Sequence, residues 1–245
     1  MGIVRVGTAG WSIPTSDSAA FPADGTSLER YAARLGCAEI NSSFHRPHRR
    51  STYERWAASV PEQFRFSVKL PKTVTHQRKL VDCSDLVSTF LEEAGGLGGK
   101  LEVILVQLPP SLAFDHALAR GFFPLLGRVA AIACEPRHPS WFEDAADALL
   151  SELKVARVAA DPARVEAAAR PGGWAGLAYY RLHGSPVIYR SSYEPERLDD
   201  YAVAMAGKVG AARDTWCIFD NTASSAAIGN ALDLMRRLNT GPLSI

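Results

Sequence analysis

Residues 101–108 read LEVILVQL, a continuous apolar run that is typical of a buried β-strand. Seven more runs of β-branched, aromatic or apolar residues occur along the chain, beginning at Ile3, Ala38, Arg65, Ala130, Ala156, Leu177 and Thr215. The starts of the eight runs lie 21 to 38 residues apart, which leaves room for a strand, a helix and two loops in each interval. The pattern predicts eight consecutive βα units.

Segments with helical periodicity lie between these runs. Residues 27–36 (SLERYAARLG) have Ser27 as a plausible cap and Gly36 as a stop signal. Residues 51–61, 85–96, 117–127, 141–153 and 223–238 show the same periodicity. In the sixth connection only residues 161–170 could be helical, so we expect that crossover helix to be short or irregular.

Alternating strands and helices require a parallel sheet, and eight such units in 245 residues match a (β/α)8 barrel. We therefore predict an α/β protein with a single TIM-barrel domain over residues 1–245. The alternative is a doubly wound open sheet, which would need a glycine-rich nucleotide loop after its first strand. Residues 7–12, GTAGWS, match that GxGxxG pattern poorly, and no linker divides the chain.

The composition is that of an ordinary globular protein. Lysine and arginine number 27 and aspartate and glutamate 26, so the net charge of +1 gives no strong field for nucleic acid or an anionic membrane. The four cysteines form no CxxC pair and are expected to be reduced thiols in a cytoplasmic protein. Neither a signal-peptide pattern nor an apolar stretch of about 18 residues occurs, so we expect no membrane partner.

Polar side chains end most of the predicted strands. Residues two apart on a strand share a face, and three strands end in such polar pairs, namely Glu39 with Asn41, Glu135 with Arg137, and Arg181 with His183. The other strands end in Lys69, Gln107, Asp161, and Asp220 followed by Asn221. In a barrel the carboxyl ends of all strands meet at one rim, where ligand sites form. We therefore expect these side chains to share one pocket.

A local ion pair or cap is the alternative reading for each of these residues. Buried ion pairs seldom improve on apolar packing, so seven polar strand ends are hard to explain by stability alone. Three cations and four carboxylates favour a small anionic ligand, gripped by Arg137 and Arg181 with Lys69 as a point charge. Glu135 or Glu39 would act as a general base if the pocket raises its pKa, and His183 as an acid. Tyr189 and Tyr193 could stack on a sugar or base.

Other motifs are weaker. The GGLGGK segment at 95–100 does not match a phosphate loop, because Leu101 stands where the motif requires serine or threonine. For the HRPHRR segment at 45–50, a solvated loop is favoured about twofold over a phosphate site. The residues Glu39, His45, Glu135, Asp161 and His183 offer metal-ligand chemistry. Their spacing has no HExxH pattern, and nearby cations would crowd a metal ion, so no metal or cofactor is predicted.

Seven ordered motifs resemble those of the YecE-like family, a bacterial domain of unknown function. They are GTAGWS (7–12), EINSSF (39–44), FSVKLPKTVTH (66–76), VQLPP (106–110), EPRHPSW (135–141), YYRLHG (179–184) and FDNTASSAAIGNAL (219–232). The resemblance covers nearly the whole chain and implies a TIM barrel similar to the endonuclease IV and xylose isomerase group. From that similarity a nucleic-acid or sugar-phosphate role has been guessed for the family.

The resemblance also implies a set of polar site positions. They fall on Glu39, Asn41, Lys69, Thr75, His76, Gln107, Glu135, Arg137, His138, Trp141, Arg181, His183, Gly184, Tyr189 and Asn221. This chain departs from the family pattern at three places, where it has His45 in place of tyrosine, Pro136 in place of phenylalanine and Asp220 in place of asparagine. Asp220 adds a carboxylate to the predicted rim.

We expect an enzyme, a hydrolase or lyase, that uses acid/base chemistry on an anionic phosphate ester or sugar derivative. Glu135, His183, Glu39 and Lys69 are the predicted catalytic residues. Asn41, His76, Gln107, Arg137, His138, Trp141, Arg181, Tyr189, Tyr193, Asp220 and Asn221 are the predicted ligand-binding residues. The rival hypothesis is a non-catalytic module that binds a ligand or nucleic acid, whose groove would be long, open and basic.

Overall fold

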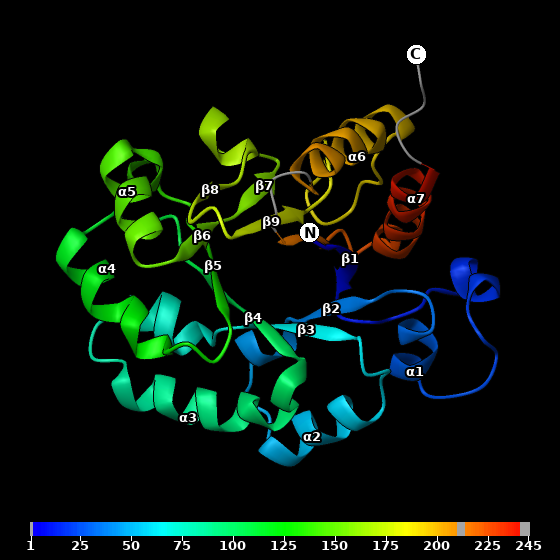
Figure 1. Ribbon diagram of the computed structural model, residues 1–245, viewed down its shortest axis with the longest axis horizontal. Helices are drawn as coiled ribbons and strands as arrows, with labels where there is room; N and C mark the ends of the chain where they lie inside the picture. Colours follow the sequence, from blue (N-terminus) through cyan, green and yellow to red (C-terminus); the bar gives the residue numbers. More distant parts are fainter. Residues whose placement is uncertain (1, 210–213, 241–245) are drawn as a thin grey trace.

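A computed structural model describes residues 2–209 and 214–240. Its strands are β1 (Val4–Ala9), β2 (Cys37–Ile40), β3 (Arg65–Lys69), β4 (Leu101–Gln107), β5 (Ala131–Glu135), β6 (Val155–Arg157), β7 (Ala159–Asp161), β8 (Gly172–Gly173), β9 (Leu177–Leu182) and β10 (Asp214–Phe219). They form one sheet in the order β7-β9-β10-β1-β2-β3-β4-β5-β6-β8 (Figure 1). Each of the eight runs predicted as strands contributes to this sheet.

The sheet nearly closes on itself through the segment that holds β6 and β7. β6 pairs with β5, and β7 pairs with β9, both in parallel. The amide of Val158, between the two short strands, donates to the carbonyl oxygen of Cys134 at 2.8 Å. β6 and β7 thus act as one bent strand that joins the two ends of the sheet. The predicted TIM-barrel fold is confirmed.

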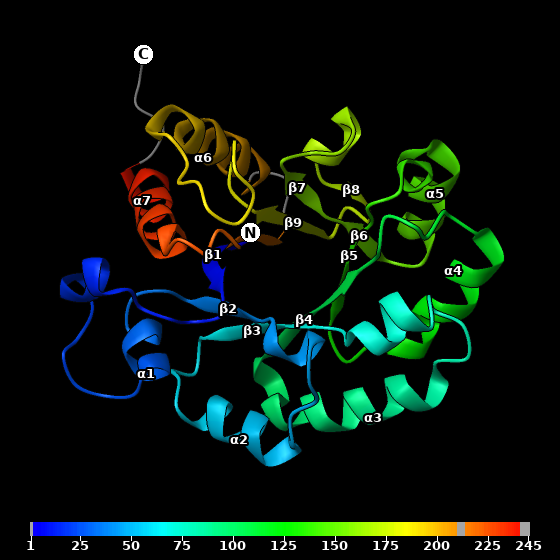
Figure 2. The same ribbon diagram turned by 180° about the vertical axis from the view of Figure 1, so that it is seen from behind.

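The helices lie outside the strands (Figures 1 and 2). They are α1 (Ser27–Ala32), α2 (Arg50–Ala58), α3 (Ser84–Ala94), α4 (His116–Phe122), α5 (Asp144–Glu152), α6 (Pro195–Val209) and α7 (Ala226–Thr240). Short helical turns cover Thr15–Ala20, Ser42–Phe44, Thr73–Gln77, Gly95–Lys100, Phe123–Leu126, Pro139–Phe142 and Glu166–Ala169. The turn at Glu166–Ala169 is the predicted short sixth crossover. Helix α6 was not predicted from the sequence.

The N-cap of helix α1 lies one residue before the predicted cap. Thr26, not Ser27, is the N-cap, because its hydroxyl accepts a hydrogen bond from the amide of Glu29 at 3.3 Å. The Glu29 carboxylate accepts in turn from the Thr26 amide at 2.7 Å, which completes a capping box. The competing residues are adjacent hydroxyl side chains, so the sequence alone could not choose between them.

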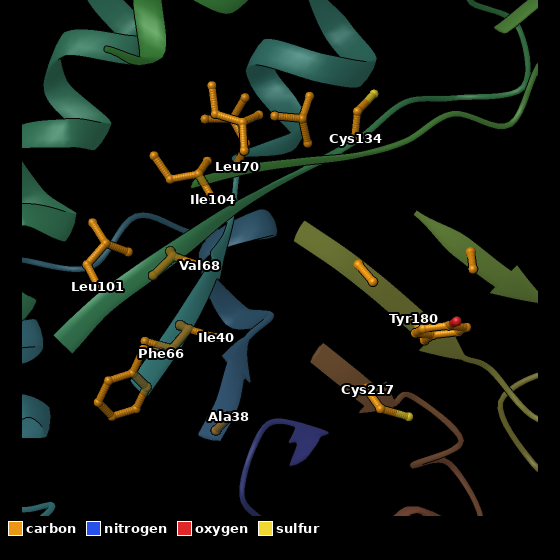
Figure 3. Close-up of a cluster of buried hydrophobic side chains, with 14 of the residues drawn as sticks. Ala38, Ile40, Phe66, Val68, Leu70, Leu101, Ile104, Cys134, Tyr180 and Cys217 are labelled. Carbon is orange, nitrogen blue, oxygen red and sulfur yellow. The ribbon is translucent and has the colours of Figure 1, made fainter. Parts of the chain in front are cut away.

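Two apolar layers surround the strands. The outer layer lies between the strands and the helices and includes Phe66, Val68 and Ile104 (Figure 3). The inner layer fills the barrel and includes Cys37, Val103, Leu105, Ala133, Tyr179, Trp216 and Ile218. All four cysteines are buried and free. In the described part of the chain, no helix has the length and apolarity that a membrane span requires.

Candidate functional site

On several strands the inner face changes from apolar to charged toward the carboxyl end. On β9 this face carries Leu177, Tyr179 and Arg181, and His183 follows just beyond the strand. On β10 it carries Trp216 and Ile218, and Asp220 follows. Because the strands are parallel, their charged ends meet at one end of the barrel. We call Glu39, Lys69, Glu135, Arg181, His183 and Asp220, which meet there, the rim cluster.

Arg181 is the centre of the rim cluster and has no exposed surface. Its Nε and Nη2 donate to the Glu39 carboxylate at 3.1 and 2.7 Å. Its Nη1 donates to Glu135 Oε2 at 2.5 Å, and Nη2 also donates to Asp220 Oδ2 at 2.8 Å. The guanidinium therefore forms ion pairs with three carboxylates. Four of the five N–H groups of Arg181 thus bind carboxylates of the protein, so its predicted role as a grip for the ligand stays a prediction.

Uncharged side chains hold the carboxylates in place. The Tyr179 hydroxyl lies 2.9 Å from Glu39 Oε2 and 2.9 Å from Ser67 Oγ. Gln107 Nε2 donates to Glu135 Oε1 at 3.0 Å. Such hydrogen bonds satisfy the remaining lone pairs, which a buried charged group needs to be tolerated.

His183 is held between two carboxylates. Its Nδ1 lies 3.0 Å from Asp220 Oδ2, and its Nε2 lies 3.4 Å from Glu135 Oε1. Burial alone would lower the pKa of this imidazole, but the charge of Glu135 and the hydrogen bond with Asp220 outweigh it and raise the pKa above its usual value. These contacts therefore favour the imidazolium form of His183. Nε2 is buried and has no hydrogen-bond partner among the described residues.

The two carboxylates beside His183 remain ionised. Burial alone would raise the pKa of Glu135, but the charges of Arg181 and His183 hold that pKa well below its usual range. The pKa of Asp220 is also lowered, because the charge of Arg181 outweighs the effect of burial. A general base near neutral pH needs a raised carboxyl pKa. The lowered pKa makes Glu135 a weak base near neutral pH, and the predicted base, Glu135 or Glu39, stays a prediction.

Lys69 lies at the end of β3 with 6% of its surface exposed. Burial, followed by the charge of Arg181, lowers the pKa of its amine to about 8. The amine lies over the Phe44 ring, 4.2 Å from the ring centre. His76 packs edge-on against the same ring at 5.0 Å, and its Nδ1 lies 2.8 Å from Thr75 Oγ1.

A cleft opens beside His183 and Glu135. It is lined by Glu135, Pro136, Arg137, Ala160, Pro162, Arg164, Ala168, His183 and Ile188. Arg137 donates to Glu135 Oε1 from Nε and Nη2, both at 3.1 Å, and keeps 19% of its side chain exposed. Arg137 Nη2 also lies 3.4 Å from the Tyr189 hydroxyl. Arginine side chains at such a mouth can bind carboxylate or phosphate groups.

Tyr189 has a strained backbone at the edge of this cleft. Its φ angle is 67°, an outlier for a bulky residue and a feature that clusters at functional sites. The ring lies edge-on to His183 with the centres 5.5 Å apart. The side chain therefore forms part of the wall beside the imidazole.

Several predicted residues lie outside the cluster. The Trp141 side chain is buried, and its indole N–H donates to the Leu112 carbonyl at 2.9 Å. Tyr193 is buried, and its hydroxyl accepts from the Gly184 amide at 2.9 Å. Asn221 donates to Asn230 and to the Ser191 carbonyl, both at 2.9 Å. These contacts anchor loops of the barrel, although Asn221 Oδ1 is buried without a hydrogen-bond partner among the described residues, and the ligand-binding roles of the three residues stay predictions.

Three further predicted residues have separate environments. His138 Nδ1 accepts from the Ser140 amide at 3.3 Å and lies 2.9 Å from Ser140 Oγ, so this histidine caps the turn that begins at Pro139. Asn41 follows β2, and its Oδ1 is buried with no hydrogen-bond partner in residues 2–209 and 214–240. Asp161 pairs with Arg197 at 3.6 Å on the outer side of the rim.

Four residues of the site, Tyr179, Ser67, Phe44 and Arg164, were not predicted from the sequence. Tyr179 and Ser67 each stand two positions before a predicted residue on the same strand face, so strand periodicity could have identified them. Phe44 and Arg164 lie in loops, and their positions depend on how those loops fold over the barrel. Among the described residues, no group of three or more His, Cys, Asp or Glu side chains is placed to hold a metal ion.

The profile of one protein family, described as "Protein of unknown function DUF72", matches residues 5–244 of the chain. The chain belongs to the DUF72 family. Two curated relatives, the UPF0759 protein YecE of Escherichia coli K12 and that of E. coli O157:H7, are each 32% identical to this DUF72 protein over 118 residues. That match covers 48% of the chain and 43% of either relative.

Two solved structures of DUF72 proteins share the fold. One from Enterococcus faecalis V583 superposes with a TM-score of 0.84 at 20% identity, covering 99% of this chain and 97% of that one. One from Thermotoga maritima MSB8 has a TM-score of 0.79 at 22% identity, covering 97% and 99%. At this level of identity, the similarity of the DUF72 protein to both structures shows a shared fold and nothing more.

Proposed function

We propose that this DUF72 protein is an enzyme that binds a small anionic substrate, a phosphate ester or a sugar-derived acid, at the rim of the barrel. The charges of the site support an anion. The carboxylates of Glu39, Glu135 and Asp220 face the cationic groups of Lys69, Arg137 and Arg181 and the imidazole of His183, whose raised pKa favours its protonated form. With His183 protonated, one positive charge is left over, and a single anionic group would neutralise it.

The observation that carries the proposal is the setting of His183. An imidazolium in a cleft can give its proton to a leaving or developing oxyanion, and its orientation must be fixed for that role. Asp220 fixes Nδ1, while Nε2 has no hydrogen-bond partner among the described residues and the ring lines the cleft. His183 is therefore the proposed general acid. Glu135 and Asp220 keep it protonated, and Arg137 binds the anion.

Arg164 offers a second contact for the anion. It lines the same cleft and forms no ion pair with any described residue. The cleft also has apolar sides, from Pro136, Pro162 and Ile188. A few polar groups beside apolar sides are typical of sites for small molecules, and the volume of about 30 Å³ admits one anionic group of the substrate and not the whole molecule. These features support a small-molecule substrate over a long nucleic-acid groove.

Binding can be tested by a thermal-shift screen against anionic metabolites that include sugar phosphates and sugar acids. A ligand at about 100 times its Kd stabilises the folded state by roughly 2.7 kcal/mol. We expect hits that weaken at least tenfold in Arg137→Met. Arg120→Met is the matched control, because Arg120 pairs with Glu152 on the exposed surface. Hits that are equally strong in Arg137→Met would contradict the assigned anion site.

Turnover separates an enzyme from a binding module. Compounds found in the screen should be converted by the wild-type protein, and His183→Gln should abolish conversion while leaving binding within a few fold. Binding without conversion of any hit would support the non-catalytic alternative. For nucleic acid, affinity at low salt that falls steeply with added salt would be the expected sign.

A further inference from the structure

Lys69 is the group in the rim cluster that lacks a partner. Its side chain is buried to all but 6%, yet it forms no hydrogen bond or ion pair with the residues that the structure describes. The negative charges of Glu39, Glu135 and Asp220 act on the Lys69 amine, but all three carboxylates form ion pairs with Arg181. Its Nζ is not one of the fully enclosed polar atoms of the described residues, so the amine keeps access to solvent although the rest of the side chain is buried. An amine that is reachable in this way and is paired with no carboxylate is free to meet a ligand.

The environment of Lys69 favours the neutral amine. Burial and the charge of Arg181 lower the pKa of the amine to about 8, so about a tenth of it is uncharged at pH 7. An ordinary lysine, with a pKa near 10.4, is uncharged in less than about one part in a thousand at that pH. The neutral amine has the lone pair that a nucleophile needs.

Phe44 and His76 complete this environment. The Phe44 ring lies against the amine with its centre 4.2 Å from Nζ, and its π-face attracts the ammonium only weakly compared with a paired carboxylate. His76 packs on the same ring. Burial, then the charges of Lys69 and Arg137, lower the pKa of His76, so its imidazole is neutral near pH 7 and can accept a proton.

We propose that Lys69 forms an imine with an aldehyde or ketone group of the anionic substrate. This inference deepens the proposed function by naming a carbonyl substrate, and it takes the anion site from that proposal. The Nζ lone pair attacks the carbonyl carbon, and the carbonyl oxygen takes up a proton. The carbinolamine then loses that oxygen as water, so both protons lost by the amine leave with it. His76 accepts and returns protons during these steps.

Reductive trapping tests the proposal directly. The full-length protein is incubated with glyoxylate, which is anionic, or glycolaldehyde, which is neutral, together with sodium cyanoborohydride, and the modified lysines are located by peptide mass spectrometry. We expect Lys69 to be modified at least tenfold faster than Lys72 and Lys79 at pH 7. Those two lysines lie on the loop that follows β3 and serve as internal controls. Equal labelling of all three, or none at Lys69, would overturn the proposal.

The two aldehydes distinguish this inference from the function on which it rests. Faster trapping of glyoxylate than of glycolaldehyde, reduced at least fivefold by Arg137→Met, supports both the imine and the anion site. Equal trapping of the two aldehydes at Lys69 supports the imine and contradicts the anion site. Anion binding in the thermal-shift screen with no trapping at Lys69 contradicts the imine alone. His76→Gln should slow trapping without changing which lysine reacts.

Discussion

Arg181 and Glu39 meet across the interior of the barrel in a two-point contact, with Nε–Oε2 at 3.1 Å and Nη2–Oε1 at 2.7 Å. Neither side chain is exposed. Arg181 comes from β9 and Glu39 from β2, and β10 and β1 lie between these strands in the sheet. The pair thus ties two separated strands together at the level where the site forms.

Removing the charge of Glu39 should be strongly destabilising. Glu39→Gln leaves the buried guanidinium with one fewer carboxylate, and breaking a buried pair typically costs about 3–5 kcal/mol. The free energy of unfolding, measured by urea denaturation, should fall by about that amount. In the control Glu152→Gln, which breaks an exposed pair with Arg120, the loss should stay within about 1 kcal/mol. Similar losses in the two variants would refute the central place given to Arg181.

Asp220 should control the protonation of His183. The pKa of His183 is raised by the charge of Glu135 and the hydrogen bond with Asp220, against the effect of burial. Asp220→Asn removes the hydrogen bond between the Asp220 carboxylate and the imidazolium, so the pKa of His183 should fall. NMR titration of the imidazole nitrogens, assigned with His183→Gln, would measure it. Glu54→Gln, an exposed change on α2, is the control and should leave the value unchanged.

The stability of the protein should depend on pH through His183. A group whose pKa is raised by folding contributes stability that is present below its unfolded pKa, near 6.5, and is lost as pH rises through the folded pKa. The free energy of unfolding should therefore fall from pH 6.5 upward, by at most about 1.4 kcal/mol per pH unit from this residue. His183→Gln should remove that part of the slope. Parallel pH profiles for the two proteins would contradict the assignment.

Lys69 should lower stability at neutral pH. The folded pKa of about 8 lies below the unfolded value, so the charged amine disfavours folding by roughly 3 kcal/mol below pH 8. Lys69→Met should raise the free energy of unfolding by about 1–3 kcal/mol, and it should remove a rise in stability of the wild-type protein between about pH 8 and 10.5. Lys72→Met is the matched control on the same loop. A destabilised Lys69→Met variant would indicate a partner for this amine.

Strand periodicity predicted most of this geometry. Glu39, Lys69, Glu135 and Arg181 stand at the inward positions of strand ends, and parallel strands bring such ends together. The pattern says which residues share a rim, and it holds because the alternation of faces does not depend on the loops. It extends to Tyr179 and Ser67, which stand on the same faces.

The sequence could not predict which charged side chains pair with one another. Arg181 looked available to a ligand because no pattern shows that three carboxylates from three strands converge on it. Trp141 and Tyr193 lie near site residues along the chain, yet their polar atoms bind backbone groups beneath the loops. These outcomes depend on side-chain directions in three dimensions. The lowered pKa of Lys69 likewise depends on burial under Phe44, which lies in a different loop.

The purified protein should contain no stoichiometric metal ion. The carboxylates of the rim cluster already accept hydrogen bonds from Arg181, so a divalent cation would have to displace the guanidinium and face its charge. Elemental analysis should find well below one zinc or manganese ion per chain, and incubation with EDTA should leave the Tm unchanged. A zinc-loaded sample dialysed against the same buffer is the control for retention. One tightly held ion per chain, with a Tm that falls on chelation, would mean that the carboxylates rearrange around a metal.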